Sequence, residues 1–208
     1  MHTATATPAW QQLNTTVDGP GERYEHNCAG MGGALYLFGG NDGDYQSSSD
    51  LWKYAVAANQ WSIVDVHGGT PPVSLGRTMV HVKGFLWLYG EAGLWVFSPE
   101  EGTWRDVGGQ VRGASPPSRT HQGCAVVGDS LYVFGGDGGG VDLSDLWVID
   151  AVEGHLHPEA ELVWTELSAG TLLPLSSAPF ARRDVGMAAL GGRMYIFGGF
   201  GTNGRRLS

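Results

Sequence analysis

The chain has 208 residues, of which 42% are hydrophobic and 16% charged, so it is long enough and apolar enough to bury a core. Its net charge of −9 argues against nucleic acid and anionic membranes as partners. No apolar run is long enough to span a membrane, and two cysteines predict no disulfide framework, so we expect a reducing compartment, the cytoplasm or the nucleus.

The 34 glycines follow no regular period and indicate frequent turns between short strands. No stretch has the spacing of an amphipathic helix, which predicts an all-β protein. Four similar hexapeptides divide the chain, and they read LYLFGG at 35–40, LWLYGE at 86–91, LYVFGG at 131–136 and MYIFGG at 194–199.

Other residues recur in register with these hexapeptides. A proline lies fifteen residues before each one, and the position three residues after the proline holds Arg23, Ser74, Arg119 and Arg182. Downstream, the first three repeats contain Leu-Trp and then a lone tryptophan. The repeats therefore predict, in chain order, a lone outer strand at 10–17, units at 20–66, 71–107 and 116–168, and a partial unit at 179–208.

Each unit reads as four short strands, which in the third unit are 124–127, 131–136, 145–150 and 163–167. Alternate residues of these strands are apolar on both faces, so each small sheet has to be covered on both sides by its neighbours. About three and a half units form an open arc and not a closed ring, because closed rings of such units need 4–8. The uncovered apolar faces at the two ends predict self-association or poor solubility.

Three repeated positions carry expectations of their own. Cys28 and Cys124 share a position with methionines of the other repeats, which predicts a buried apolar site and no bond between the two cysteines. The paired glycines are expected to end the second strand, where a side chain would hinder a sharp exit or a close backbone approach. Asp50 and Asp145 precede Leu-Trp and are expected to cap turn amides.

The double glycine after an aromatic residue, the downstream Leu-Trp and the lone tryptophan, at a period near 50, together resemble the kelch-repeat family. The P-x-x-R opening resembles the branch with host-cell-factor-type and Rab-effector-type kelch proteins. The resemblance implies a β-propeller and a non-catalytic scaffold or adaptor that binds another protein. The second repeat departs from the pattern, with Ser74 in place of the arginine, Arg77 three residues later and Glu91 in place of a glycine.

In such propellers the loops between strands two and three, and between strand four and the next strand one, share the face that receives the partner. The loops between strands two and three are 41–49, Ala92-Gly93, 137–144 and the tail 200–208. The loop Ala92-Gly93 has only two residues, which predicts a notch in the rim. The candidate partner-binding residues on this face are Arg23, Arg77, Arg119, Arg182, Asp42, Tyr45, Asp137 and Asp142. The arginines could bind an acidic or phosphorylated segment, or each could brace its own loop against neighbouring carbonyls; both alternatives stay open.

The alternative function is a metal-dependent enzyme, because galactose oxidase and the nitrile-specifier proteins build metal chemistry on kelch-type propellers. Here the cysteines read as core and no acidic–histidine cluster stands at the expected loops, so we expect no catalytic residue and no cofactor. The insertion 153–161 contains His155 and His157 among three glutamates, which is either a metal-type donor set or a solvated loop.

Overall fold

The structure is a computed structural model that describes residues 10, 12–13, 19–73, 76–150, 157, 160–169, 179–201 and 205–207. In these residues the regular structure consists of β-strands and one 3-10 turn, η1 (Gly108–Gln110), which confirms the predicted all-β class. None of the elements described is a helix of the length and apolarity that a membrane crossing requires.

The strands form successive small antiparallel sheets. Unit one contains β1 (Asn27–Met31), β2 (Ala34–Asn41), β3 (Ser47–Ala55) and β4 (Gln60–Ile63). Unit two contains β5 (Thr78–Val82), β6 (Phe85–Gly90), β7 (Gly93–Ser98) and β8 (Thr103–Asp106). Unit three contains β10 (Gly123–Val127), β11 (Ser130–Asp137), β12 (Asp142–Asp150) and β13 (Leu162–Ser168).

Unit four pairs β15 (Gly186–Leu190) with β16 (Arg193–Phe197). A small sheet beside it contains β14 (Arg182–Arg183), β17 (Phe200–Gly201) and β18 (Arg205–Arg206). One strand was not predicted: β9 (Val111–Arg112) lies after unit two and pairs in parallel with β13, so it extends unit three to five strands.

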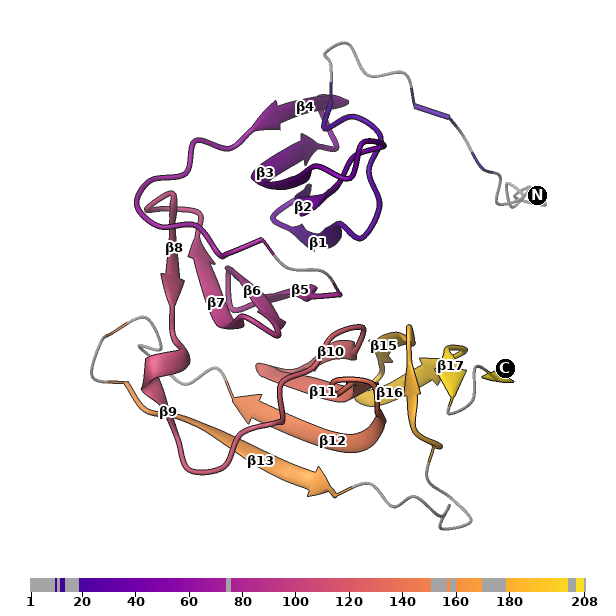
Figure 1. The fold of residues 1–208 in the computed structure, drawn as a ribbon. Helices are drawn as coiled ribbons and strands as arrows, with labels where there is room; N and C mark the ends of the chain where they lie inside the picture. Colours follow the sequence, from indigo (N-terminus) through magenta and orange to yellow (C-terminus); the bar gives the residue numbers. More distant parts are fainter. Residues whose placement is uncertain are drawn as a thin grey trace, which may run out of the picture.

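The units follow one another along an arc (Figure 1). The first strands lie innermost, because β1 contacts β5, β5 contacts β10, and β10 contacts β15. The opening of the arc lies between unit one and unit four, at the right of Figure 1. This arrangement confirms the predicted incomplete propeller with an open arc.

Each sheet has two apolar faces that pack in a constant order. We call face A the one that carries the first and third residues of the hexapeptide, and face B the one that carries the second and fourth. Leu86 and Leu88 on face A of unit two pack in one core with Tyr36 and Phe38 on face B of unit one. The next joint repeats this order, with Leu131 and Val133 of unit three in one core with Trp87 and Tyr89 of unit two. Successive units are therefore joined face A to face B.

In units one and three the paired glycines form a bulge inside the second strand and do not end it, whereas in unit four β16 ends at Phe197, directly before Gly198 and Gly199, as we expected. The register of β2 with β3 shifts between Phe38 and Gly40, and β2 continues to Asn41. A Cβ on Gly40 would lie 2.9 Å from the carbonyl oxygen of Tyr24, and the φ of Gly40 is +98°. The expected close backbone approach is present, and it explains why this position takes glycine.

The structure corrects two further expectations and describes only part of a third. Asp50 and Asp145 lie within β3 and β12 and bind side chains, so they are not turn caps. In unit two the turn residues are Glu91 and Ala92, because Gly93 pairs with Gly90. Of the predicted strand at 10–17, residues 10, 12 and 13 have no strand assignment, and the others lie outside the described residues.

Candidate partner-binding face

Arg23 makes internal contacts within its own unit. Its Nη1 donates to the carbonyl oxygen of Gly39 and to Oδ1 of Asp50, both at 2.9 Å. Its Nε donates to the carbonyl oxygen of Pro20 at 2.8 Å. The indole of Trp52 donates to Oδ2 of Asp50 at 2.5 Å, so arginine, carboxylate and tryptophan form one network. These are the contacts that the bracing alternative predicts.

Arg119 repeats this network in unit three with deeper burial. Its Nη1 and Nη2 donate to the two carboxylate oxygens of Asp145 at 2.7 and 2.6 Å, a bidentate pair. Its Nη1 also donates to the carbonyl oxygen of Gly135 at 3.0 Å, and Trp147 donates to Asp145 at 2.7 Å. The side chain of Arg119 is fully buried, so its guanidinium contributes chiefly to the unit itself.

Arg182 binds two carbonyl oxygens, those of Phe180 and Gly198, each at 3.0 Å. Within the residues described it has no carboxylate at hydrogen-bonding distance. Burial lowers the pKa of its guanidinium. The contact with Gly198 matches those of Arg23 with Gly39 and Arg119 with Gly135, so the three arginines share one structural position.

Unit two lacks all parts of this network. Ser74 stands in the arginine position, the bulge is absent from β6, and Gly93 occupies the position of the strand-three carboxylate. Arg77 does not replace the missing arginine. It directly precedes β5 and packs on Gly90, whereas Gln122 packs on Gly136 in unit three. Arg77 therefore shares a position with Gln122 and not with Arg119.

Arg77 is buried and keeps unused hydrogen-bond donors. Its side chain is 8% exposed, and neither Nε nor Nη2 has an acceptor in the described residues. Burial lowers the pKa of Arg77, and the negative charge of Glu91 works in the opposite direction. A buried guanidinium with two nitrogens that have no acceptor among the described residues is costly, so this position favours an acceptor supplied by water or by a ligand.

Two cavities adjoin at the short loop of unit two. One encloses about 300 Å³ and is lined by Glu91, Ser118, Arg119, Thr120, Asp137 and Gly138–Gly140. The other encloses about 250 Å³ and extends from Glu91 and Ser118 over Gly90 to Trp164. The shortened loop therefore leaves a hollow between units two and three, where the sequence predicts a notch.

The remaining predicted residues lie on the loops of this face. Asp42 accepts hydrogen bonds from the amides of Asp44 and Gln46, both at 2.9 Å, and so shapes the first loop. Tyr45 is 80% exposed and contacts the ring of Tyr24 edge-on. Its side chain is the largest apolar surface that this loop offers to a partner.

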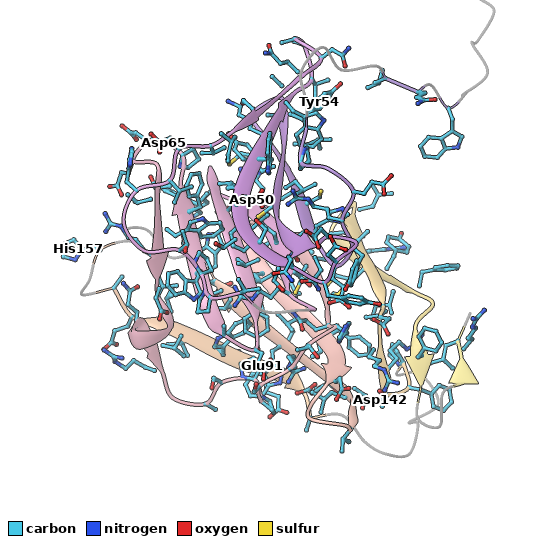
Figure 2. All side chains as sticks on the ribbon, turned by 45° about the horizontal axis from the view of Figure 1, so that its top comes forward. Asp50, Tyr54, Asp65, Glu91, Asp142 and His157 are labelled. Carbon is cyan, nitrogen blue, oxygen red and sulfur yellow. The ribbon has the colours of Figure 1, made fainter. Side chains whose placement is uncertain are left out.

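The acidic residues of the third loop also bind within the chain. Asp137 accepts a hydrogen bond from the amide of Gly140 at 2.5 Å. Asp142 is buried and pairs with Arg183 of unit four at 2.8 Å, so it joins two units. Figure 2 shows Glu91 and Asp142 well apart from Asp65 and His157, which lie along the other margin of the molecule. The partner-binding role of the predicted residues stays a prediction.

His81 and His121 serve local structure. His81 accepts a hydrogen bond at Nε2 from the amide of Gly84 at 3.0 Å. His121 has a φ of +57°, as Glu25 and Asp184 have +55° and +53° at the same repeat position. The His121 amide donates to Gly76, and the Asp184 amide donates to His121, so backbone hydrogen bonds link the inner ends of units two, three and four.

No three His, Cys, Asp or Glu side chains come together as a metal site in the residues described. Of the insertion 153–161, only His157, Ala160 and Glu161 are described, so the predicted donor set lies mostly outside the described residues. Burial raises the pKa of the Cys124 thiol to about 12, which leaves almost no reactive thiolate at neutral pH.

Sequence reasoning missed Gln122 and Ser118. Gln122 donates from Nε2 to the carbonyl oxygen of Tyr89 at 3.0 Å, and its Oε1 has no donor among the described residues. Ser118 lines both cavities. The sequence did hold a signal for Gln122, because Gln122 and Arg77 are long polar residues at the same repeat position.

Comparisons with known proteins agree with this geometry. The family model described as "KLHDC2/KLHL20/DRC7 Kelch-repeats domain" matches residues 91–208, and the model described as "Kelch motif" matches residues 22–65. The solved structure of YjhT superposes with a TM-score of 0.71 at 20% identity, and the match covers 97% of this chain and 65% of that one.

Curated relatives include proteins with different roles in their names. The chain is 27% identical to the mouse Rab9 effector protein with kelch motifs, over 91% of this chain and 51% of the relative. It is 28% identical to the rat Kelch domain-containing protein 10, over 86% of this chain and 46% of the relative. It is 26% identical to the N-(sulfonatooxy)prop-2-enimidothioate sulfolyase of Thlaspi arvense, over 88% of this chain and 53% of the relative.

The chain thus spans about half the length of these three curated relatives. The repeated strand pattern, the propeller arc and the family match over more than half of the residues agree with one another. The chain belongs to the kelch-repeat family.

Proposed function

We propose that this chain is a non-catalytic interaction module of the cytoplasm or nucleus that binds a partner protein on its loop face. The single observation that carries the proposal is the hollow between units two and three, where two cavities adjoin at Glu91 and Ser118. A hollow bordered by variable loops on a constant scaffold is a usual place for recognition. Relatives named as a Rab9 effector and as Kelch domain-containing proteins support an interaction role.

The partner presents an acidic or phosphorylated segment in this proposal, and Arg77 is the group that favours it. Arg23 and Arg119 bind Asp50 and Asp145 through their guanidinium groups, whereas Nε and Nη2 of Arg77 have no acceptor in the part of the chain that the structure describes. These two nitrogens form one edge of the guanidinium, which binds a carboxylate with two parallel hydrogen bonds. Gly90 lines the smaller cavity, and the Cα, Cβ and Cγ atoms of Arg77 lie against it, which supports Arg77 as a candidate.

An array of acidic, phosphorylated, neutral and basic peptides, read by fluorescence polarisation, tests the proposal. We expect the acidic or phosphorylated peptides to bind and Arg77→Gln to weaken their binding at least tenfold, because a charge-assisted pair is lost. Arg105→Gln is the matched control, since Arg105 is an exposed arginine paired with Glu101 on β8, away from the hollow. Preference for basic or neutral peptides, or equal binding by the two variants, contradicts the acidic-partner proposal.

The second candidate is a metal-dependent enzyme, which the name of the sulfolyase relative favours. Elemental analysis of the purified chain distinguishes the two functions. Copper or iron at one equivalent per chain would replace the non-catalytic proposal, whereas substoichiometric metal agrees with it.

A further inference from the structure

The smaller of the two cavities has an apolar, buried floor. The side chains of Tyr89, Leu94 and Trp164 line it and are 6%, 2% and 5% exposed. The rings of Tyr89 and Trp164 lie 5.3 Å apart, and all three residues belong to the core between units two and three. Gly90 and Pro116, which also line the cavity, are buried as well. The packing of the two units therefore holds this floor in place.

The rim of the same cavity is polar. Glu91, Ser115 and Ser118 line the cavity and are exposed to solvent. A serine hydroxyl can donate to the carbonyl oxygen of a peptide, and a carboxylate can accept a hydrogen bond from a peptide N–H. An apolar floor inside a polar rim is the arrangement of the pockets that take an anchor side chain at protein interfaces.

The composition and size of the cavity suit an apolar side chain. Gly93, which lines it, holds the repeat position of Asp50 and Asp145, and glycine brings no carboxylate to this position. The cavity encloses about 250 Å³. An apolar cavity of about 150 Å³ already takes a benzene molecule, so a leucine or phenylalanine side chain fits here. Sites of this kind favour apolar occupants, because their walls offer few hydrogen bonds to water.

We propose that the smaller cavity takes a leucine or phenylalanine side chain of the partner segment, close to that segment's acidic or phosphorylated residue. The inference rests on the proposed loop-face function and adds an apolar anchor to it. The two groups lie close together because Gly90, in the cavity floor, packs against Cβ and Cγ of Arg77. The larger cavity does not suit the acidic residue, because Glu91 and Asp137 both line it and repel a further negative charge.

Glycine–serine peptides with one central glutamate test the proposal. Leucine, phenylalanine, alanine or glutamine is placed in turn at each of the three positions on either side of the glutamate, and affinity is read by fluorescence polarisation. We expect leucine or phenylalanine at one of these positions to tighten binding at least about tenfold over alanine or glutamine there, because an apolar side chain becomes buried. This series uses the wild-type chain, so its result does not depend on the folding of a variant.

Ser115→Phe places a ring of the chain itself at the rim of the smaller cavity and should abolish the preference for leucine and phenylalanine. Ala114→Phe is the matched control, since Ala114 is an exposed neighbour that lines neither cavity, and it should keep the preference. Circular dichroism verifies that both variants are folded. N-acetylphenylalanine amide, added as a competitor, distinguishes a peptide anchor from a free small molecule.

Equal binding of the leucine, phenylalanine, alanine and glutamine peptides overturns the inference, whereas the acidic-partner proposal survives if glutamine in place of the central glutamate weakens binding. A preference that persists in Ser115→Phe also overturns the inference, because the apolar residue then binds elsewhere. So does competition by N-acetylphenylalanine amide as strong as that of the peptide. If the apolar preference holds and the central glutamate has no effect, the anchor stands and the acidic preference falls. If no peptide of the series binds, both fall.

Discussion

Arg119 and Arg23 hold the same repeat position and bind the same kinds of group, but they differ in burial. The Arg119 and Asp145 side chains are 0% and 10% exposed, whereas those of Arg23 and Asp50 are 12% and 22% exposed. Burial of Asp50 works to raise its pKa, yet hydrogen bonds from Arg23, Ser48 and Trp52 outweigh it and lower the pKa. The Asp50 carboxylate therefore stays a charged partner of Arg23 at neutral pH.

At the residue scale, we predict that Arg119→Ala lowers the free energy of unfolding more than Arg23→Ala. Removing one partner of a buried ion pair costs about 3–5 kcal/mol, because the other charge stays buried and unpaired. The more exposed Arg23 network should lose about 1.5–3 kcal/mol. Urea unfolding followed by tryptophan fluorescence measures both values. Arg105→Ala, at an exposed pair, should cost about 1 kcal/mol or less. Equal losses for all three variants would contradict the bracing role.

At the scale of the element, the bulge in strand two links the hexapeptide to the arginine network. The carbonyl oxygens of Gly39 and Gly135 both accept a hydrogen bond from an arginine, and the glycine that follows each one approaches a neighbouring backbone. Unit two lacks the arginine, the bulge and the carboxylate together, and its loop shrinks to two residues. The hollow of the loop face therefore lies beside the unit that departs from the repeat in all of these features.

Gly136→Ala tests this link. The φ of Gly136 is +103°, and a Cβ there would lie 2.7 Å from the carbonyl oxygen of Thr120. We expect a loss of stability of about 2–4 kcal/mol, since backbone strain and a clash act together. Gly139→Ala is the control, because Gly139 also has a positive φ, +80°, but has open space around its Cα. Gly139→Ala should lower the stability by about 1–2 kcal/mol. An equal loss of stability for both variants would show that the clash at Gly136 contributes nothing.

At the scale of the whole molecule, position along the arc decides which equivalent residues are buried. Cys28 and Cys124 occupy the same repeat position, yet unit two covers only the second. Burial raises the pKa of both thiols, to about 12 for Cys124. A raised pKa reduces the thiolate fraction at every pH below it, so exposure decides which thiol reacts faster.

We predict that iodoacetamide at mildly alkaline pH alkylates Cys28 of the native chain and leaves Cys124 unmodified until urea is added. Peptide mass spectrometry measures the two rates separately. Equal rates at the two cysteines in the native chain would contradict the burial that the structure assigns.

The sequence by itself determined the repeat, the four-stranded unit and the need to cover both sheet faces. Strand alternation and recurring aromatic and glycine residues are local signals, so they can be read without neighbours. The predicted strands of unit three, for example, lie within the observed β10, β11, β12 and β13.

Only the tertiary structure decided which arginine has donors without an acceptor among the described residues, and which face of each end unit, A or B, is exposed. The carboxylate partner of Arg119 lies 26 residues along the chain, and no spacing distinguishes that partner from the other acids. The parallel pairing of β9 with β13 likewise joins segments from different parts of the sequence. Whether Leu35 or Phe197 is buried depends on whether another unit packs on its face, and that contact is not encoded in the residues around it.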